Sequence, residues 1–338
     1  MHASGRSAES PDNRSFLQQT DNFPFVSVII PIPPHMEHPG ILNSIRKLDY
    51  PQEKLEILLS SGCLPSRQRN LAAREASGDF LVFWDDDVIV PPGYLHEMLQ
   101  FYRSSSCSGA GGPCLPHPNH SRTQQTIAYI LSSWWGLGPL SARYKKSRTR
   151  HNATDKDLIL CNCSIQRDVF LSSGGFNEHL FPNEENELID RLRAGGITFG
   201  YTPSLATQRP VEPTLQAHWK KMFGYGQGRA KQLKLNFSVR NLEHLTVMFL
   251  PWLTLALFPL QRPFATGFVY AYLLWLLCAV ASAWRRFGSL PTAFLAGWGI
   301  FGTHAAYCGG FWYGLVHKIS DKKSAARDNG VTVRKINF

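Results

Sequence analysis

Short apolar runs alternate with helical patterns from residue 25 to residue 84, and this alternation limits the possible folds more than any other feature. β-branched and aromatic residues predict buried strands at 25–32, 55–61 and 79–84. The segments between them, 41–48 and 66–78, show the apolar spacing or the final glycine of helices. This order of elements predicts an α/β fold with a mainly parallel sheet and helices on both faces.

The pattern continues less regularly toward residue 203. Helices are predicted at 91–104 and 183–196, the first because prolines occupy its first turn and the second because its first turn is acidic. A strand that leads into a helix is predicted at 158–170, and further strands near 109–112 and at 197–203. Clusters of Gly and Pro make much of the stretch between residues 105 and 160 hard to interpret.

Three adjacent aspartates, Asp85, Asp86 and Asp87, directly follow the third predicted strand. Parallel sheets bind ligands beyond the carboxyl ends of their strands. If the strand continues, Asp85 and Asp87 point one way and Asp86 the other, because side chains alternate along a strand. Two such carboxylates suit Mg²⁺ or Mn²⁺ with a bound diphosphate. The alternative is a polar turn that caps the next helix.

The last third of the chain contains three long stretches without a charged residue. They span 245–261, 263–284 and 287–316, and the third has His304 as its one ionisable group. Because a bilayer needs about 20 apolar residues, the second and third are predicted to cross a membrane. The first is short and carries two prolines, so it crosses or lies in the interface. Buried helices of a soluble bundle are the alternative.

The basic residues that give the chain its net charge of +10 are concentrated in the segments next to these apolar stretches. A basic segment at 212–244 is expected to contact anionic lipid or a lipid-linked diphosphate, or to fix the topology. Nucleic acid is not expected as a partner, because no recognition motif occurs. The positive-inside rule favours the cytoplasmic side for the basic tail at 317–338.

The remaining composition predicts a cytoplasmic domain. Residues 1–22 are polar and lack an apolar signal segment, so they are expected to form a flexible cytoplasmic tail. The seven cysteines show no zinc-like spacing, which favours reduced thiols. The predicted parts are therefore this tail, an α/β domain at 23–211, a basic amphipathic juxtamembrane segment at 212–244, two to three transmembrane or interfacial helices at 245–316, and a basic tail at 317–338.

Several motifs occur together and in order. They are SVIIPI at 27–32, RNLAAREASGDFLVFWDDDVIVPPGYL at 69–95, GGFNE at 174–178 and EENEL at 184–188. Over residues 25–235 the chain resembles the inverting glycosyltransferases of family 2, which have the GT-A fold. The basic segment followed by apolar stretches resembles a membrane-attached subgroup that includes the succinoglycan-type exopolysaccharide glucosyltransferases.

The resemblance implies an activity and a location. It implies a metal-dependent nucleotide-diphospho-sugar transferase that moves a hexosyl group to a lipid-linked or membrane-associated acceptor, in the assembly of cell-surface polysaccharide or glycolipid. The enzyme would sit at the inner membrane with its catalytic domain in the cytoplasm. The Gln-x-x-Arg-Trp motif of processive synthases is absent, so transfer of a single sugar is expected.

The resemblance also implies the roles of individual residues. Glu185 would be the general base, and Asp87 with Asp85 would bind Mn²⁺ or Mg²⁺. The residues implied for nucleotide-sugar binding are Pro31, Glu37, Ser61, Arg69, Asp85 and Asp86. The residues implied on the acceptor side or in support are Glu184, Glu187, Gly175 and Arg209. The alternative for the acidic cluster is that it complements the N-terminus of a helix.

Two departures from the family pattern concern the donor. The carboxylate that usually follows the second strand and contacts uracil is missing, since Ser60 and Ser61 stand there. The usual Asn-Glu after the first strand is replaced by PPHME, in which Glu37 is a substitute. UDP is the default nucleotide, and GDP or another stays open. A non-catalytic membrane protein that kept the fold is the main alternative. A nucleotidyltransferase is disfavoured, because the loop after the first strand lacks Lys and Arg.

Overall fold

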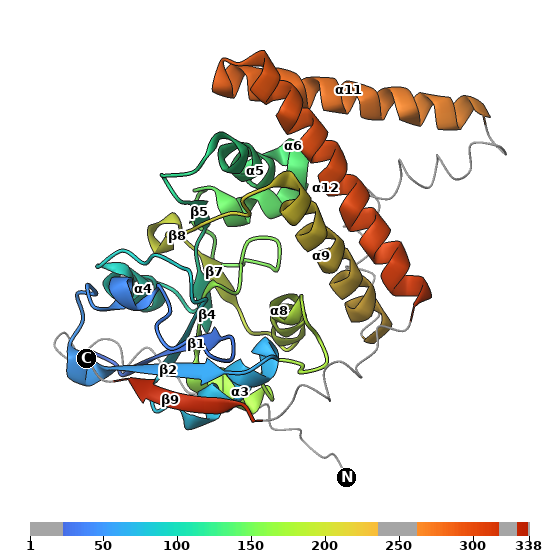
Figure 1. Ribbon diagram of the computed structural model, residues 1–338. Coiled ribbons are helices and arrows are strands. Elements are labelled where there is room, and N and C mark those ends of the chain that lie inside the picture. The colour runs from blue at the N-terminus through green and yellow to red at the C-terminus, as the bar shows by residue number, and fades with distance from the viewer. Residues whose placement is uncertain (1–22, 236–261, 318–329, 337–338) are drawn as a thin grey trace, which may run out of the picture.

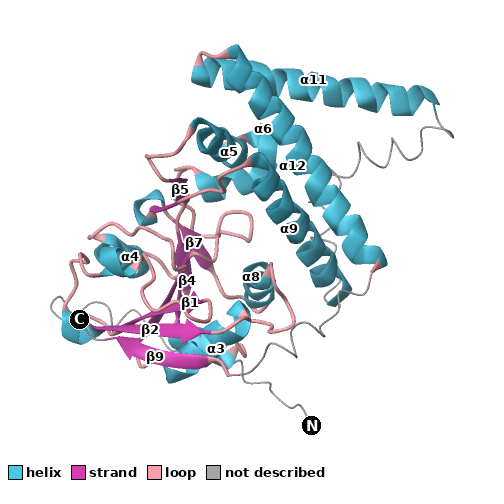
Figure 2. Cartoon of the chain, viewed as in Figure 1, coloured by secondary structure: helices cyan, strands magenta, loops and turns pink. Residues whose placement is uncertain are grey.

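A seven-stranded mixed sheet forms the centre of the computed structural model, which describes residues 23–235, 262–317 and 330–336 (Figures 1 and 2). The strand order is β7-β4-β6-β3-β1-β2-β9. β1 (Val26–Ile32), β2 (Leu55–Ser61) and β3 (Phe80–Trp84) are parallel neighbours and match the predicted strands closely. Their carboxyl ends therefore lie at one edge of the sheet.

The strands on the β3 side make the sheet mixed. β6 (Asn162–Gln166) runs antiparallel to both β3 and β4 (Gly109–Gly111), whereas β7 (Phe199–Tyr201) is parallel to β4. A separate two-stranded sheet pairs β5 (Cys114–Pro116) with β8 (Thr207–Arg209). β8 brings Arg209 toward the edge where β3 ends.

The basic tail contains a strand that was not predicted. β9 (Thr332–Ile336) pairs antiparallel with β2 and forms the last strand on that side of the sheet (Figure 1). Lys335 Nζ lies 2.9 Å from Glu56 Oε2, which ties the tail to the neighbouring strand. Charged side chains on an edge strand are common because they discourage pairing with other chains. The basic composition concealed the strand, since only Val333 and Ile336 of its residues are apolar.

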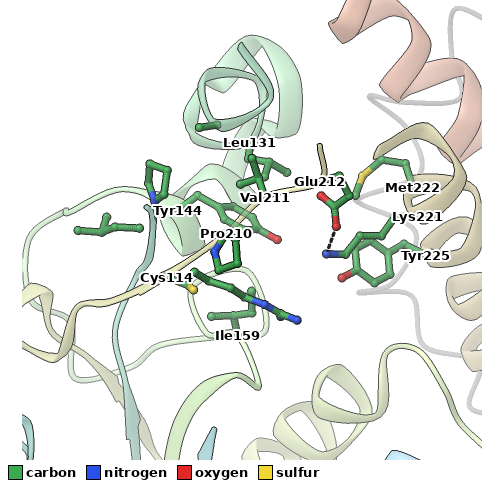
Figure 3. A pocket seen from close by; sticks show the side chains of 14 residues that line it. Cys114, Leu131, Tyr144, Ile159, Pro210, Val211, Glu212, Lys221, Met222 and Tyr225 are labelled. Carbon is green, nitrogen blue, oxygen red and sulfur yellow. Dashed lines mark hydrogen bonds and ion pairs between the residues drawn. The ribbon is translucent and has the colours of Figure 1, made fainter. Parts of the chain in front are cut away.

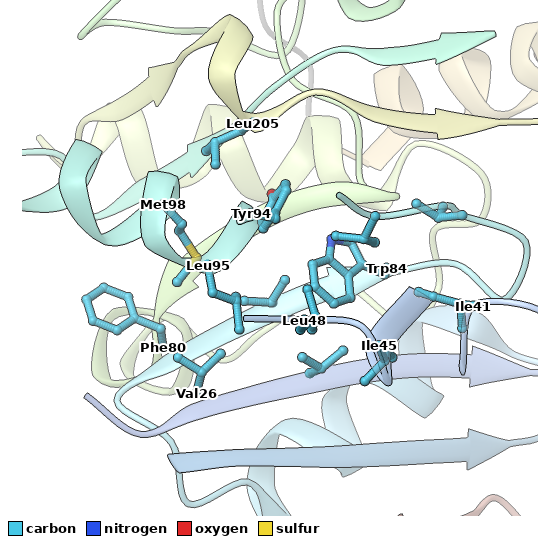
Figure 4. Close-up of a cluster of buried hydrophobic side chains, with 14 of the residues drawn as sticks. Val26, Ile41, Ile45, Leu48, Phe80, Trp84, Tyr94, Leu95, Met98 and Leu205 are labelled. Atoms are coloured by element: carbon cyan, nitrogen blue, oxygen red, sulfur yellow. The ribbon is translucent and has the colours of Figure 1, made fainter. Parts of the chain in front are cut away.

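Helices cover both faces of the sheet, as predicted. On one face, α4 (Tyr94–Ser104) and the short α2 (Leu42–Ile45) pack against the sheet through the cluster in Figure 4. On the other face lie α3 (Pro65–Glu75), α7 (Arg167–Ser172) and α8 (Glu184–Ala194). Trp84 is fully buried and stacks edge-on against Tyr94. Burial of large side chains such as these stabilises the fold by about 1.5–3 kcal/mol each.

The region that resisted interpretation contains α5 (Arg122–Ser132), α6 (Trp134–Leu137) and the 3₁₀ helix η2 (Gly138–Tyr144). A sequence signal for α5 was available. Ser121 Oγ accepts from the backbone N–H of Gln124, and the Gln124 side chain accepts from the backbone of Ser121. This reciprocal pair is a capping box, and its Ser-x-x-Gln pattern marks a helix start. Two further 3₁₀ turns, η1 (Gln52–Lys54) and η3 (Pro203–Leu205), lie in connections.

Long helices lie beside the α/β domain. α9 (Leu215–Leu235), which lies in the predicted basic segment, packs lengthwise against α12 (Leu290–Val316) (Figure 1). α11 (Arg262–Phe287) contacts α12 through its C-terminal half and extends away from α9. Glycines permit the close approach, because a Cβ on Gly226 or Gly310 would collide with the backbone of the other helix. His218 of α9 and Thr303 of α12 are hydrogen-bonded at 2.9 Å in the buried contact.

The apolar stretches differ in their surroundings. Among the described residues, one stretch, Thr266–Phe287 in α11, is long and apolar enough to cross a membrane, with a mean hydropathy of 1.7. α12 presents one face to α9 and α5, while Leu290, Phe294 and Trp298 are more than half exposed on another. The first stretch, 245–261, lies outside the described residues.

Candidate active site

The aspartate triplet lies just beyond β3, which ends at Trp84. Asp85 is the most enclosed of the three and contacts two guanidinium groups. Arg69 Nη2 from α3 lies 2.8 Å from Asp85 Oδ1, and Arg209 Nη1 lies 2.8 Å from Asp85 Oδ2. Burial alone would raise the pKa of Asp85, but Arg209 and Arg69 together hold it below its ordinary value. Asp85 is therefore a charged, fixed carboxylate.

Arg209 also reaches the third aspartate. Its Nε lies 2.7 Å from Asp87 Oδ1, so the two outer carboxylates face the same guanidinium. Asp87 Oδ1 is buried and, among the described residues, accepts no hydrogen bond of good geometry. Burial and the two neighbouring aspartates raise the pKa of Asp86, which makes no contact of this kind with Arg209. The triplet is thus divided into an outer pair and a middle residue.

The acidic start of α8 joins the same network. Glu184 Oε1 lies 3.0 Å from Arg69 Nη1, so Arg69 bridges Glu184 and Asp85. Burial, together with the Glu185 carboxylate, raises the pKa of Glu184 to about 8. Arg69 opposes this shift, because its guanidinium favours the charged form of Glu184. The resulting order of contacts is Glu184, Arg69, Asp85, Arg209 and Asp87.

Glu185 has a different environment from its neighbour. Its side chain is 15% exposed, against 4% for Glu184, and it lies 3.7 Å from Arg143 Nη1. Arg143 comes from η2 and is otherwise held by the Asp155 carbonyl and by Asn186 Oδ1 at 2.6 Å. Sequence reasoning missed Arg143, because nothing in the basic stretch around it distinguishes this arginine from its neighbours. Glu185 is therefore the more accessible of the two carboxyl groups.

The GGFNE turn supports this arrangement from behind. Asn70 of α3 accepts from the backbone N–H of Phe176 at 2.9 Å and donates to its carbonyl at 2.8 Å. Glu187 is buried and pairs with Arg191 at 2.8 Å, and Arg191 donates to the carbonyls of Ser173 and Gly175. Glu187 and Gly175 therefore hold the turn against α3 and α8.

Replacing Gly175 with alanine is expected to destabilise the protein more than the same change at Gly174. Both glycines have positive φ, +76° and +82°, so either alanine costs about 1–2 kcal/mol of backbone strain. A Cβ at Gly175 would also lie 2.5 Å from Asn70 Oδ1, whereas a Cβ at Gly174 meets nothing within 4 Å. The crowding adds about 1–3 kcal/mol. Thermal unfolding checks the order, and equal melting temperatures for the two variants would contradict it.

The remaining predicted donor residues lie along the same edge, nearer β2. Pro31 and Ser61 are near the ends of β1 and β2, with Pro31 opposite Ser60 in the parallel register. Glu37 is exposed in the loop after β1, and its carbonyl accepts from Arg334 at 3.1 Å. No described contact joins these three residues to the aspartates. They extend the candidate site toward the edge strand.

A pocket lies on the other side of Arg209, between the small sheet and the helices α5 and α9 (Figure 3). Its lining is mainly apolar, with Met222, Ile159 and Leu131 among the residues drawn. Lys221 Nζ and Glu212 Oε1 form an ion pair at 2.5 Å on one wall. The cavity has a volume of about 40 Å³.

The donor set at the triplet fits a hard divalent cation. Asp85 and Asp87 present carboxylate oxygens to one point, and Asp87 Oδ1 is a buried oxygen with spare accepting capacity. Within the described residues no group of three or more His, Cys, Asp or Glu side chains is placed to hold a metal ion. A cation here would therefore keep water or phosphate oxygens as most of its ligands, as Mg²⁺ commonly does.

Comparison with known proteins agrees with this fold. Residues 42–170 match the family model of Glycosyl transferase family 2, a segment that includes the aspartate triplet and ends before α8. No curated protein matches the chain at a significant level.

Solved structures that match the chain include a mannosyltransferase and TarS. The mannosyltransferase PcManGT from Pyrobaculum calidifontis, in complex with GDP-Man and Mn²⁺, is 15% identical with a TM-score of 0.51, and the match covers 90% of this chain and 92% of that one. A crystal structure of TarS from S. aureus is 14% identical with a TM-score of 0.42, covering 86% of this chain and 90% of that one. The first likeness confirms the predicted GT-A fold class and shows the fold alone.

Proposed function

We propose that this protein is a metal-dependent inverting glycosyltransferase of the family 2 type. It moves one sugar from a nucleotide-diphosphate sugar, with UDP as the default nucleotide, to a lipid-linked or membrane-associated acceptor. The observation that carries the proposal is the contact between two distant motifs. Arg69 bridges Asp85, at the end of β3, and Glu184, at the start of α8. A diphosphate-side carboxylate and a base-side carboxylate thus belong to one network.

The proposed chemistry follows from the positions of the charged groups. Glu185 takes the proton from an acceptor hydroxyl, whose oxygen then bonds to the anomeric carbon. The bond from that carbon to the diphosphate oxygen breaks, and its electrons leave with the nucleoside diphosphate. Attack and departure on opposite faces invert the anomeric carbon. A cation bound by Asp85 and Asp87 would neutralise the leaving diphosphate.

Arg209 has two possible partners in this scheme. In the structure it balances the charges of Asp85 and Asp87. A cation and a guanidinium cannot both occupy the space between these two carboxylates, since like charges repel. Arg209 therefore turns to the diphosphate oxygens when the carboxylates hold a cation, and guanidinium groups suit phosphate well.

Membrane attachment through α11 and α12 forms part of the proposal. Exposed apolar residues on these helices include Leu274, Leu277, Phe294 and Trp298, and a bilayer would cover them. α12 contacts α9, and β9 pairs with β2, so α12 and β9 would both lie on the same side of the membrane as the α/β domain. The end of the chain at β9 would then be cytoplasmic. Recovery of the full chain in the soluble fraction of lysed cells, without detergent, would contradict attachment.

A donor panel tests the activity. The detergent-purified protein is expected to hydrolyse at least one of UDP-glucose, UDP-N-acetylglucosamine and GDP-mannose slowly, because water can replace the acceptor. EDTA should abolish the reaction and added Mn²⁺ should restore it. If no donor is bound or hydrolysed with Mn²⁺ present, the protein is the non-catalytic alternative. The missing carboxylate after β2 is the feature that favours that alternative.

A further inference from the structure

The C-terminal strand lies next to the donor side of the candidate site. Its pairing with β2 places Thr332 opposite Ser61, the last residue of β2, so β9 begins at the edge where β2 ends. Val331 lies close to Gly62, the residue that follows β2. A Cβ added to Gly62 would be 3.1 Å from Val331 Cγ2. The start of the strand is therefore at the ligand-binding edge of the sheet.

The chemistry proposed above fixes which way a donor lies along this edge. The sugar must approach Glu185, and the diphosphate must meet the aspartates after β3. The nucleoside is attached to the far phosphate, so it points away from Glu185. Glu184, Arg143 and Arg209 lie on the side of β3 toward α8, whereas β1 and β2 lie on its other side. β1 and β2 follow β3 at spacings of about 4.8 Å each, so a nucleoside that extends in this direction lies over β1 and β2.

Two surfaces bound this part of the edge. One is the loop at residues 33–40 after β1, and the other is the start of β9. Arg334 joins them, because its Nη2 donates to the Glu37 carbonyl at 3.1 Å. Beneath them, Gln68 Nε2 donates to the carbonyls of Ile32 and Ser60, which fixes the ends of β1 and β2. The floor is thus rigid, and the loop is tied to β9 through Arg334.

We propose that β9 forms the outer wall of the nucleoside site and that Arg334 is a positioning residue for it. This inference rests on the proposed function. Arg334 holds the 33–40 loop against the start of β9, and Thr332 lies opposite Ser61. The tail would thereby replace the carboxylate that is missing after β2. The ligand class is the nucleoside half of a nucleoside diphosphate.

Arg334→Ala tests the inference, with Lys335→Ala as the matched control. Both residues are exposed and basic on the same strand, but Lys335 pairs with Glu56. Binding of UDP, GDP and inorganic pyrophosphate to the full-length protein is measured by calorimetry with Mn²⁺. Arg334→Ala is expected to weaken nucleoside diphosphate binding about 10-fold or more, because it removes one charge-assisted hydrogen bond and releases the loop that this bond fixes. Pyrophosphate binding should not change, and Lys335→Ala should bind all three normally.

Further readouts separate positioning from simple stability. The donor KM should rise in Arg334→Ala while kcat at saturating donor stays unchanged, and Arg334→Lys should recover part of the affinity. Equal UDP and GDP affinities in Arg334→Ala and the unchanged protein would overturn the inference, as would equal losses in both alanine variants. If the unchanged protein binds neither nucleotides nor pyrophosphate, the proposed function itself fails.

Discussion

Replacing Glu185 with glutamine is expected to lower kcat for sugar transfer by about 10²–10⁴-fold, the usual contribution of a general base. The amide keeps the size of the side chain and its hydrogen-bonding oxygen but cannot accept the acceptor's proton. Donor binding should be nearly unchanged, because Glu185 makes no described contact with Asp85 or Asp87. Single-turnover transfer and calorimetric binding of the nucleoside diphosphate measure the two effects separately.

Glu184→Gln is the matched control, since it makes the same change one residue away. Glu184 is buried against Arg69, and burial with the Glu185 charge raises its pKa to about 8. The amide keeps the size of the side chain and an oxygen that can accept from Arg69. The variant should therefore keep Arg69 in place and retain most of its transfer activity. The assignment of the base is wrong if Glu184→Gln loses transfer while Glu185→Gln transfers normally.

The central part of the fold was predictable because its signals are local. β1, β2 and β3 are short β-branched or aromatic runs, and their parallel order follows from the helices between them. The antiparallel insertion of β6 between β3 and β4 was not predictable, because it depends on pairing between distant segments. β9 was missed for a related reason. Its two apolar residues, Val333 and Ile336, pack against the apolar clusters on the two faces of the sheet. The sequence alone does not indicate these contacts.

In the candidate site, too, the sequence identified some residues and not others. The acidic members, Asp85, Asp87 and Glu185, stand in short motifs that sequence reasoning could select. Their basic partners could not be assigned in this way. Arg69 was assigned to the nucleotide sugar and Arg209 to the acceptor side or a supporting role, and Arg143 was missed. Arginines are frequent in this chain, and only the fold shows which guanidinium groups meet which carboxylates.

Replacing Asp87 with asparagine is expected to weaken Mn²⁺ binding and to lower kcat/KM for transfer by about 10²-fold or more. Removal of one charged ligand costs several kcal/mol of charge stabilisation, and each 1.4 kcal/mol is about tenfold. Asp86→Asn is the control within the same triplet. Its carboxyl forms no described ion pair with Arg209, and burial with the two neighbouring aspartates raises its pKa. Its replacement should therefore leave metal binding within about threefold of normal.

Arg209→Gln separates two roles of Asp85 and Asp87, which are pairing with Arg209 and binding a cation. Because Arg209 competes with a cation for Asp85 and Asp87, its removal should tighten Mn²⁺ binding in the absence of donor. Turnover should nevertheless fall, since the diphosphate loses its guanidinium partner. Electron paramagnetic resonance of free Mn²⁺ gives the affinity without requiring activity. Weaker Mn²⁺ binding in Arg209→Gln, or equal binding in Asp87→Asn and Asp86→Asn, would show that these aspartates do not form the cation site.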